Sequence, residues 1–155
     1  MSVKTIYPGK LITGIAAIDE EHRRLRQLLA EVRGICAEYD RKDTCAGCSE
    51  GKVAGCERQL IACLTEILGF MMEHFRGEER ILKAKCQTEV EKGLFAQHVE
   101  AHVDLIERAV MVTTLDDLQR TVRHIVDAVA ILDHWLTDHI ERFDVPMLRE
   151  SRAPG

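Results

Sequence analysis

The chain has 155 residues and a formal net charge of −5, with 46% hydrophobic and 30% charged residues. This length and balance predict one globular domain, residues 1–155, and exclude a disordered chain. The acidic charge, with no basic stripe, argues against nucleic acid as a partner. Apolar runs are too short to cross a membrane, and residues 1–10 do not have the apolar stretch of a signal peptide. We therefore expect a cytoplasmic protein that makes no membrane contact.

Four long stretches carry apolar residues at every third or fourth position, which is the spacing of amphipathic helices. Residues 1–17 precede them, and we expect an extended N-terminal arm there. The first three predicted helices cover residues 18–39, 56–85 and 90–112. The fourth begins at a capping-box pattern, Thr114 with Asp117, and runs to Phe143, after which Pro146 is expected to stop it.

The connections between the last three helices are short, and short connections make consecutive helices antiparallel neighbours. We therefore predict an all-α fold, an up-down-up-down four-helix bundle with an extended N-terminal arm. The first connection is different. Residues 41–55 contain three glycines, two of the six cysteines and no apolar periodicity, and we interpret them as a cysteine-rich insertion between the first two helices.

Histidines and carboxylates lie on the apolar, inward faces of all four predicted helices. Two of the pairs are four residues apart, so both members of each pair project from one helix face. A buried imidazole or carboxylate without a partner costs several kcal/mol, and a metal site explains why so many occur together. The candidate ligands are His22, His74, Glu78, His98, His102, His139 and Asp144.

The pair in the fourth helix has an unusual spacing. His139 and Asp144 are five residues apart, which corresponds to about 140° on an ideal α-helix. They converge only if the helix unwinds near Phe143. His134 falls on roughly the opposite face, and we expect it in solvent near Asp138.

The number and type of these side chains indicate which metals they suit. Five imidazoles and two carboxylates are too rich in nitrogen for Mg²⁺ or Ca²⁺, and too many for one tetrahedral Zn²⁺. They suit two first-row ions bridged by Glu78 and Asp144. If an oxo or hydroxo group also bridges, the ion with three histidines is closed, and the ion with two has one open position for a small ligand.

Four sequence stretches resemble the hemerythrin family, in particular single-domain bacterial hemerythrins. They are GIAAIDEEH at 14–22, HFRGEE at 74–79, HVEAH at 98–102 and WLTDHIERFD at 135–144. The resemblance covers residues 12–147 and fills all seven ligand positions of the family motif. Two features depart from the family. The N-terminal arm has Tyr7 where members usually carry Trp, and the first connection is longer and rich in cysteine.

The resemblance implies a centre of two iron ions with a bridging oxo or hydroxo group, which binds O2 reversibly at one ion. Small anions such as azide occupy the same position. By the family pattern, His98, His102 and His139 bind the closed iron, His22 and His74 bind the open iron, and Glu78 and Asp144 bridge. We expect the wall of the ligand pocket to be formed by Phe70, Phe75, Ile18 and Trp135.

The cysteines suggest a second site. Helix geometry allows five of them to converge at one end of the bundle, namely Cys36, Cys45, Cys48, Cys56 and Cys63. Three interpretations remain open: a thiolate site for Zn or an iron–sulfur cluster, a reversible disulfide, and small buried apolar side chains. Cys86 lies in the loop after the second helix and is expected to stand apart.

The preferred hypothesis is a protein that binds O2 for storage, delivery or sensing, and not an enzyme with an organic substrate. One alternative is a di-iron enzyme that reduces peroxide or handles nitric oxide. Another is a redox or iron sensor in which the cysteine-rich loop reports to a redox or signalling protein that the sequence does not identify. The absence of an output domain within the chain weighs mildly against the sensor.

Overall fold

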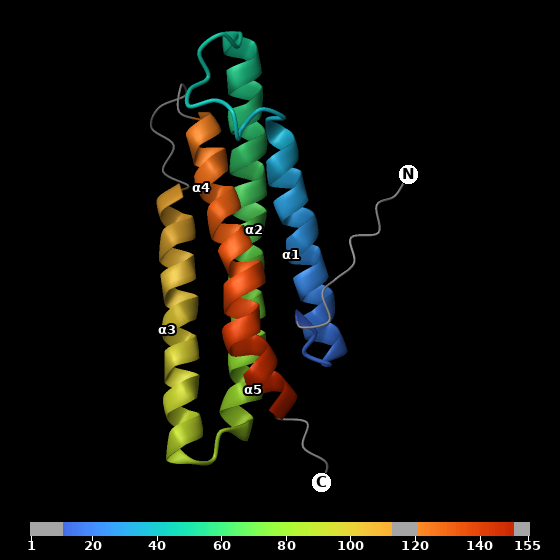
Figure 1. Ribbon diagram of the computed structural model, residues 1–155, viewed down its shortest axis with the longest axis vertical. Coiled ribbons are helices and arrows are strands. Elements are labelled where there is room, and N and C mark those ends of the chain that lie inside the picture. Colours follow the sequence, from blue (N-terminus) through green and yellow to red (C-terminus); the bar gives the residue numbers. More distant parts are fainter. Residues whose placement is uncertain (1–10, 113–120, 151–155) are drawn as a thin grey trace.

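The structure, a computed structural model, describes residues 11–112 and 121–150. Within these ranges, helix α1 covers Ala16–Ile35, α2 covers Glu50–Lys85 and α3 covers Glu89–Val112. The fourth segment is continuous and consists of α4 (Thr121–His134), the π-helix η3 (Trp135–Asp144) and α5 (Val145–Glu150). Each segment runs antiparallel to the one before it (Figure 1), so the predicted all-α, up-down-up-down bundle is confirmed.

The bundle core is built from the apolar stripes that the sequence periodicity predicts. On α1, Leu25, Leu28 and Val32 recur at helical spacing and are fully buried. The side chains of α2 and of the fourth segment that meet them include Leu60, Met71, Ile125, Leu132 and Trp135. This main core runs along the inside of the bundle, and the candidate site lies inside the bundle near one end of it.

Two helices begin at side-chain caps. The hydroxyl of Ser49 accepts a hydrogen bond from the backbone N–H of Lys52 at 3.2 Å, which fixes the start of α2. At the start of α3, the Thr88 hydroxyl accepts from the Glu91 N–H at 3.1 Å, while the Glu91 carboxylate accepts from the Thr88 N–H at 2.9 Å. This reciprocal pair is a capping box, and it sets the sharp turn between α2 and α3.

The first connection is shorter than the sequence predicted. Helix α1 ends at Ile35 and not at Tyr39, because Cys36 is extended and a turn follows it. Helix α2 begins at Glu50, so only residues 41–49 of the expected insertion at 41–55 are loop. The helix persists through Gly51 and Gly55, each of which costs about 1 kcal/mol relative to Ala. The Ser49 cap and the burial of Val53 against Val122 offset this cost.

The end of the N-terminal arm is tied to the start of α1. The carboxylate of Asp19 accepts hydrogen bonds from the Thr13 N–H at 2.8 Å and from the Gly14 N–H at 3.0 Å. Gly14 has φ +83°, a left-handed conformation that suits glycine. The expected arm at 1–17 is therefore too long, because α1 already begins at Ala16. Tyr7 lies outside the described residues.

The end of the fourth segment also corrects the sequence interpretation. Pro146 does not stop the helix, which continues through α5 to Glu150. Pro146 lies where the π-helical turn of η3 changes to the α-helical turn of α5, so the N–H that proline lacks falls at a change of hydrogen-bond pattern. Residues 11–15 pack beside this segment, and the Arg149 side chain donates to the Ile12 carbonyl at 2.8 Å. The predicted capping box at 113–117 lies outside the described residues.

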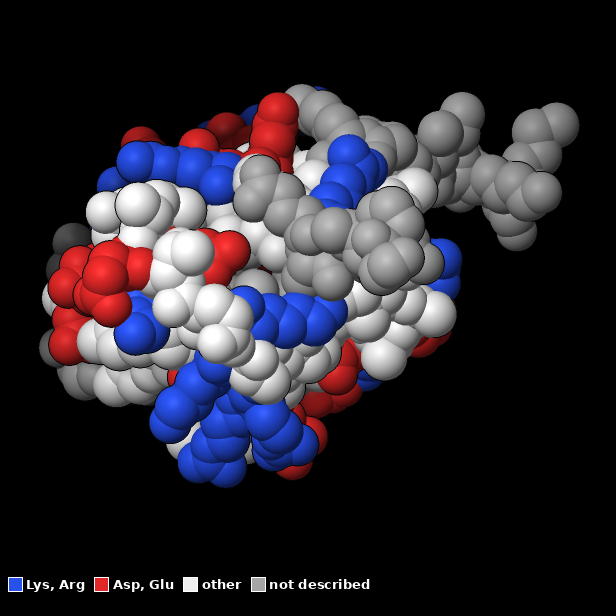
Figure 2. Space-filling model, turned by 90° about the horizontal axis from the view of Figure 1, so that it is seen from below, with Lys and Arg blue, Asp and Glu red and all other residues white. Residues whose placement is uncertain are grey.

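The end of the bundle that carries α5 is shown from below in Figure 2. Acidic and basic side chains both lie on this face, in separate groups with uncharged side chains between them. Among the described residues, no helix is long and apolar enough to span a membrane.

Candidate metal centre

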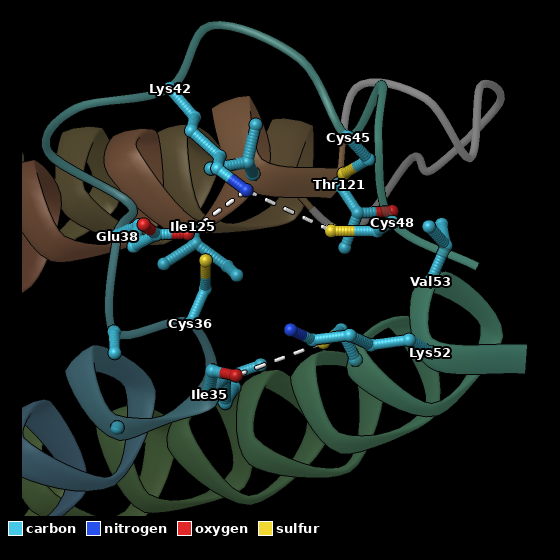
Figure 3. Close-up of a pocket in the computed structure, with 14 residues that line it drawn as sticks. Ile35, Cys36, Glu38, Lys42, Cys45, Cys48, Lys52, Val53, Thr121 and Ile125 are labelled. Carbon is cyan, nitrogen blue, oxygen red and sulfur yellow. Dashed lines mark hydrogen bonds and ion pairs between the residues drawn. The ribbon is translucent and has the colours of Figure 1, made fainter. Parts of the chain in front are cut away.

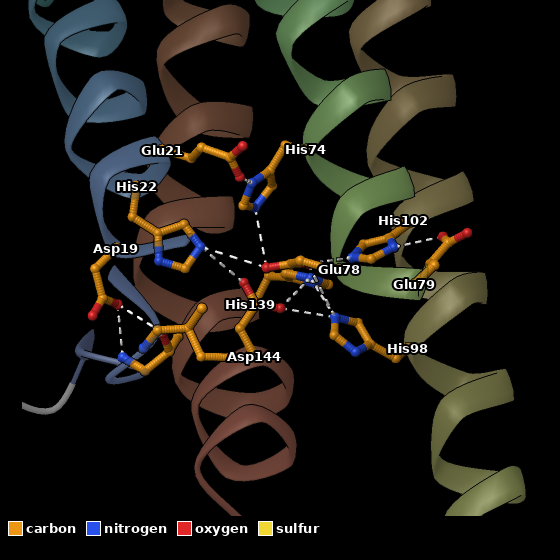
Figure 4. A network of polar contacts seen from close by, with 12 residues as sticks. Asp19, Glu21, His22, His74, Glu78, Glu79, His98, His102, His139 and Asp144 are labelled. Carbon is orange, nitrogen blue, oxygen red and sulfur yellow. Dashed lines mark hydrogen bonds and ion pairs between the residues drawn. The ribbon is translucent and has the colours of Figure 1, made fainter. Parts of the chain in front are cut away.

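The seven predicted ligands come together inside the bundle (Figure 4). They come from four segments, namely α1 with His22, α2 with His74 and Glu78, α3 with His98 and His102, and η3 with His139 and Asp144. Each of the seven is at most 2% exposed. The seven side chains meet at one level because all four segments cross it and each turns a polar position inward there.

The seven side chains form two groups that share both carboxylates. One group is Glu78, His98, His102, His139 and Asp144, and the other is His22, His74, Glu78 and Asp144. Within each group, the candidate ligand atoms all lie within 4.8 Å of one another. Three imidazoles therefore belong to one group and two to the other, as the sequence analysis expected.

Each carboxylate turns one oxygen toward each group. Glu78 Oε1 lies 3.1 Å from His74 Nε2, and Glu78 Oε2 lies 3.3 Å from His102 Nε2. Asp144 Oδ2 lies 3.2 Å from His22 Nε2, whereas Oδ1 lies 2.8 Å from His98 Nε2. Two carboxylates in this orientation can bridge two cations.

A π-helix brings His139 and Asp144 together. In η3 the i→i+5 turn places residues five apart on the same face, which an α-helix does not do. His139 Nε2 consequently lies 3.1 Å from Asp144 Oδ1. The sequence analysis expected unwinding near Phe143 alone, but the altered turn extends over Trp135–Asp144.

Two further carboxylates orient the histidines from outside, and the sequence analysis did not identify them. Glu79 lies 2.8 Å from Nδ1 of His102, and Glu21 contacts Nδ1 of His74. Both leave the Nε2 atom of their histidine directed at the centre. Such carboxylate–histidine pairs fix the ring orientation and raise the basicity of metal-binding imidazoles. One feature of the sequence could have identified them: Glu79 directly follows Glu78, and Glu21 directly precedes His22.

The electrostatics of the cluster favour bound positive charge. Burial lowers the pKa of His74, but the charge of Glu78 and the hydrogen bond with Glu21 outweigh it and raise this pKa to about 10. Burial likewise raises the pKa of Asp144, but hydrogen bonds with His139, His22 and His98 outweigh it and hold the pKa well below its ordinary value. The carboxylates therefore stay anionic and attract protons or cations to the imidazoles.

The hydrogen bonding of these side chains also indicates that they suit a cation. Six buried atoms that face the centre make no well-oriented hydrogen bond among the described residues, although they lie close to one another. They are His22 Nε2, His74 Nε2, His102 Nε2, both oxygens of Glu78 and Asp144 Oδ2. Leaving such groups unsatisfied is costly. Imidazole nitrogen and carboxylate oxygen are ligands that first-row transition ions accept.

The other two histidines lie away from the cluster. His134 is 47% exposed and lies 3.6 Å from Asp138, as predicted. His124, for which no role was predicted, lies on α4 beyond the cluster.

Four of the five cysteines in the predicted second site line one cavity of about 350 Å³, namely Cys36, Cys45, Cys48 and Cys56. Cys63 does not join them, which corrects the prediction. It lies seven residues beyond Cys56, about 10 Å farther along α2, in a surface groove with Glu31 and Glu66. Cys86 stands apart at the end of α2, as expected. All six cysteines are free of disulfides.

Comparison with known proteins agrees with this geometry. The family model of the hemerythrin HHE cation binding domain matches residues 13–148. Searches of curated proteins and of solved structures return no significant match. The matched range contains α1, α2, α3, all but the last two residues of the fourth segment, and all seven buried side chains. The chain therefore belongs to the hemerythrin family and carries its cation-binding domain.

Proposed function

We propose that the chain is a non-heme di-iron protein that binds O2 reversibly, for storage, delivery or sensing. The observation that carries this proposal is the unequal division of five imidazoles around two shared carboxylates. Two iron ions with a bridging oxo or hydroxo group, held by these seven side chains, would supply the O2 chemistry.

The number of donors supports one open position. Glu78 and Asp144 would each offer one oxygen to each ion, and an oxo or hydroxo bridge would add one more. His98, His102 and His139 complete six donors on one side. His22 and His74 bring the other side to five, so the position for O2 or azide belongs to the two-histidine side.

Aromatic side chains pack around His74 on that side. The Phe70 ring stacks on His74 with centroids 5.8 Å apart, and Trp135, which is fully buried, lies 5.7 Å from the same imidazole. Phe75 fills the space between Trp135 and His102, with centroid distances of 4.9 and 3.8 Å. A dry, apolar wall suits a small uncharged ligand. Ile18 packs elsewhere, against Leu82 and Leu148.

The test uses purified full-length protein loaded with Fe²⁺ without air. We expect two irons per chain, and an absorption band that appears with O2, disappears under argon and returns over several cycles. Azide should shift the band of the oxidised protein. One metal per chain, or none after loading, would contradict the proposal.

Three variants test the two sides separately. His22→Ala should lose the response to O2 and azide first, because it removes one of the two imidazoles on the open side. His102→Ala should lose metal, because it opens the closed side, and metal binding is coupled to folding. His134→Ala is the matched control on the exposed face and should behave as wild type. Catalytic consumption of peroxide or nitric oxide, with no return of O2 under argon, would favour the enzymatic alternative instead.

A further inference from the structure

A cavity lined by four thiols (Figure 3) lies beside the loop between α1 and α2, at the end of the bundle opposite α5 (Figure 1). Cys36 follows the last residue of α1, Cys45 and Cys48 lie in the loop between α1 and α2, and Cys56 lies near the start of α2. From Cys56 to His74 is 18 residues of one helix, which is about 27 Å. The cavity is therefore separate from the histidine cluster and shares no side chain with it.

A tight turn holds two of the thiols side by side. The Cys48 N–H donates to the Cys45 carbonyl at 3.1 Å, which closes the Cys-x-x-Cys segment. Gly47 has φ +92°, a left-handed conformation that L side chains rarely adopt. Figure 3 shows the sulfur atoms of Cys45 and Cys48 on the loop side of the cavity, with Cys36 across from them. Three chain segments thus bring thiols to one space.

The charges around the cavity suit a group with a net negative charge. Lys42 Nζ lies 4.0 Å from Cys48 Sγ, and Lys52 also lines the cavity. The N-terminus of α2, with its partial positive charge, begins directly after Ser49. Four thiolates around one divalent ion carry a net charge of −2. The two lysines offset this charge in part, because Glu38 also lines the cavity and pairs with Lys42 at 2.9 Å.

We propose that Cys36, Cys45, Cys48 and Cys56 bind one zinc ion. Four thiols each release a proton and four Zn–S bonds form, so no electron is transferred and no oxidant is needed. Four thiolates are a common ligand set for structural zinc. No three of these sulfur atoms lie within 4.8 Å of one another, so the loop must close on the ion. The ion would then fix the loop against both helices.

The number of thiols favours a metal site over a redox pair, because a disulfide uses two thiols and four line this cavity. The Cys56 thiol donates to the Ile35 carbonyl at 3.7 Å, so it lies against the end of α1, next to Cys36.

The experiment uses the full-length, iron-loaded protein, reduced with a phosphine and titrated with Zn²⁺ under argon. We expect one tightly bound zinc per chain, and X-ray absorption at the zinc edge should show sulfur neighbours at about 2.3 Å. The double variant Cys45→Ser/Cys48→Ser should lose this zinc and keep the azide-sensitive iron spectrum. Cys63→Ser and Cys86→Ser are matched controls, and both should keep it.

Protection of thiols from alkylation tests the same proposal without variants. Zinc should protect Cys36, Cys45, Cys48 and Cys56, while Cys63 and Cys86 stay reactive, and mass spectrometry distinguishes the six. Zinc bound through nitrogen or oxygen alone, or retained by the double variant, overturns the proposal. So does iron with sulfide at these cysteines, or loss of two thiols in air with no zinc bound. Failure of this site leaves the O2 proposal untouched, because the two clusters share no residue.

Discussion

Replacing Glu79 with Gln tests whether the outer carboxylates tune the metal centre. Glu79 is about one-third exposed, and it contacts Nδ1 of His102 at 2.8 Å. Glu79→Gln keeps the shape and a hydrogen-bonding oxygen but removes the negative charge. We expect weaker metal binding in the group that contains His98, His102 and His139, and little change in the group that contains His22 and His74.

The size of the effect follows from the kind of hydrogen bond that is lost. A hydrogen bond to a charged group contributes about 1.5–3 kcal/mol, against about 0.5–1.5 kcal/mol for a neutral pair. The difference, about 1–1.5 kcal/mol, corresponds to a five- to tenfold loss of affinity. This loss lies at or just below the lower limit of the 10–100-fold range typical of such outer residues, which agrees with the partial exposure of Glu79.

Competition with a chelator for Fe²⁺, measured without air, gives the affinities of both ions. Glu73→Gln is the matched control, because Glu73 is an exposed carboxylate on the same helix. Glu21→Gln should act on the other group, through His74. An affinity in Glu79→Gln within twofold of the Glu73→Gln control would refute the reasoning. So would an equal loss at both ions.

Three further outcomes are expected. Phe75→Ala should lower the free energy of unfolding by about 3–5 kcal/mol in urea titrations, because Phe75 is 2% exposed and packs against four rings. Asp19→Asn should cost about 1–3 kcal/mol and speed hydrogen exchange at Thr13 and Gly14, whose N–H groups it binds. Unchanged hydrogen-exchange rates at Thr13 and Gly14 would contradict this prediction. The metal-free protein should unfold at lower urea at pH 9.5 than at pH 7. His74 has a folded pKa of about 10, above its ordinary value, so its stabilising charge is lost as the pH rises through that value. An unchanged urea midpoint would contradict this.

The sequence was sufficient for the fold because the apolar periodicity of each helix is strong. Leu25, Leu28 and Val32 face the core as the spacing predicts. The helix ends were predicted less well. The glycines at 51 and 55 suggested a loop, but the Ser49 cap and the packing of Val53 extend α2 through them. Local propensity is a weak guide where a cap and tertiary packing act together.

The inner side chains of the candidate site could be predicted, and the outer ones could not. His74 and Glu78 are recognisable because polar side chains lie on the apolar faces of all four predicted helices, and a set of this kind indicates a shared partner. Glu21 and Glu79 look like ordinary exposed carboxylates in the sequence. Only the packing of neighbouring helices shows which imidazole each one contacts. Likewise, an angle on a helical wheel placed Cys63 with Cys56, but the rise along the axis separates them.

The π-helix shows how the site and the fold constrain each other. On an α-helix, residues five apart differ by about 140°, and residues nine apart point in opposite directions. Trp135, Ile140 and Asp144 are nevertheless all fully buried, which an α-helix over this range could not achieve. The i→i+5 turn has poorer hydrogen-bond geometry and occurs often at functional sites. Here it directs Trp135 into the core and both His139 and Asp144 into the centre. The same ten residues thus bury an apolar side chain in the core and two polar side chains in the centre, and this burial offsets the cost of the unusual backbone.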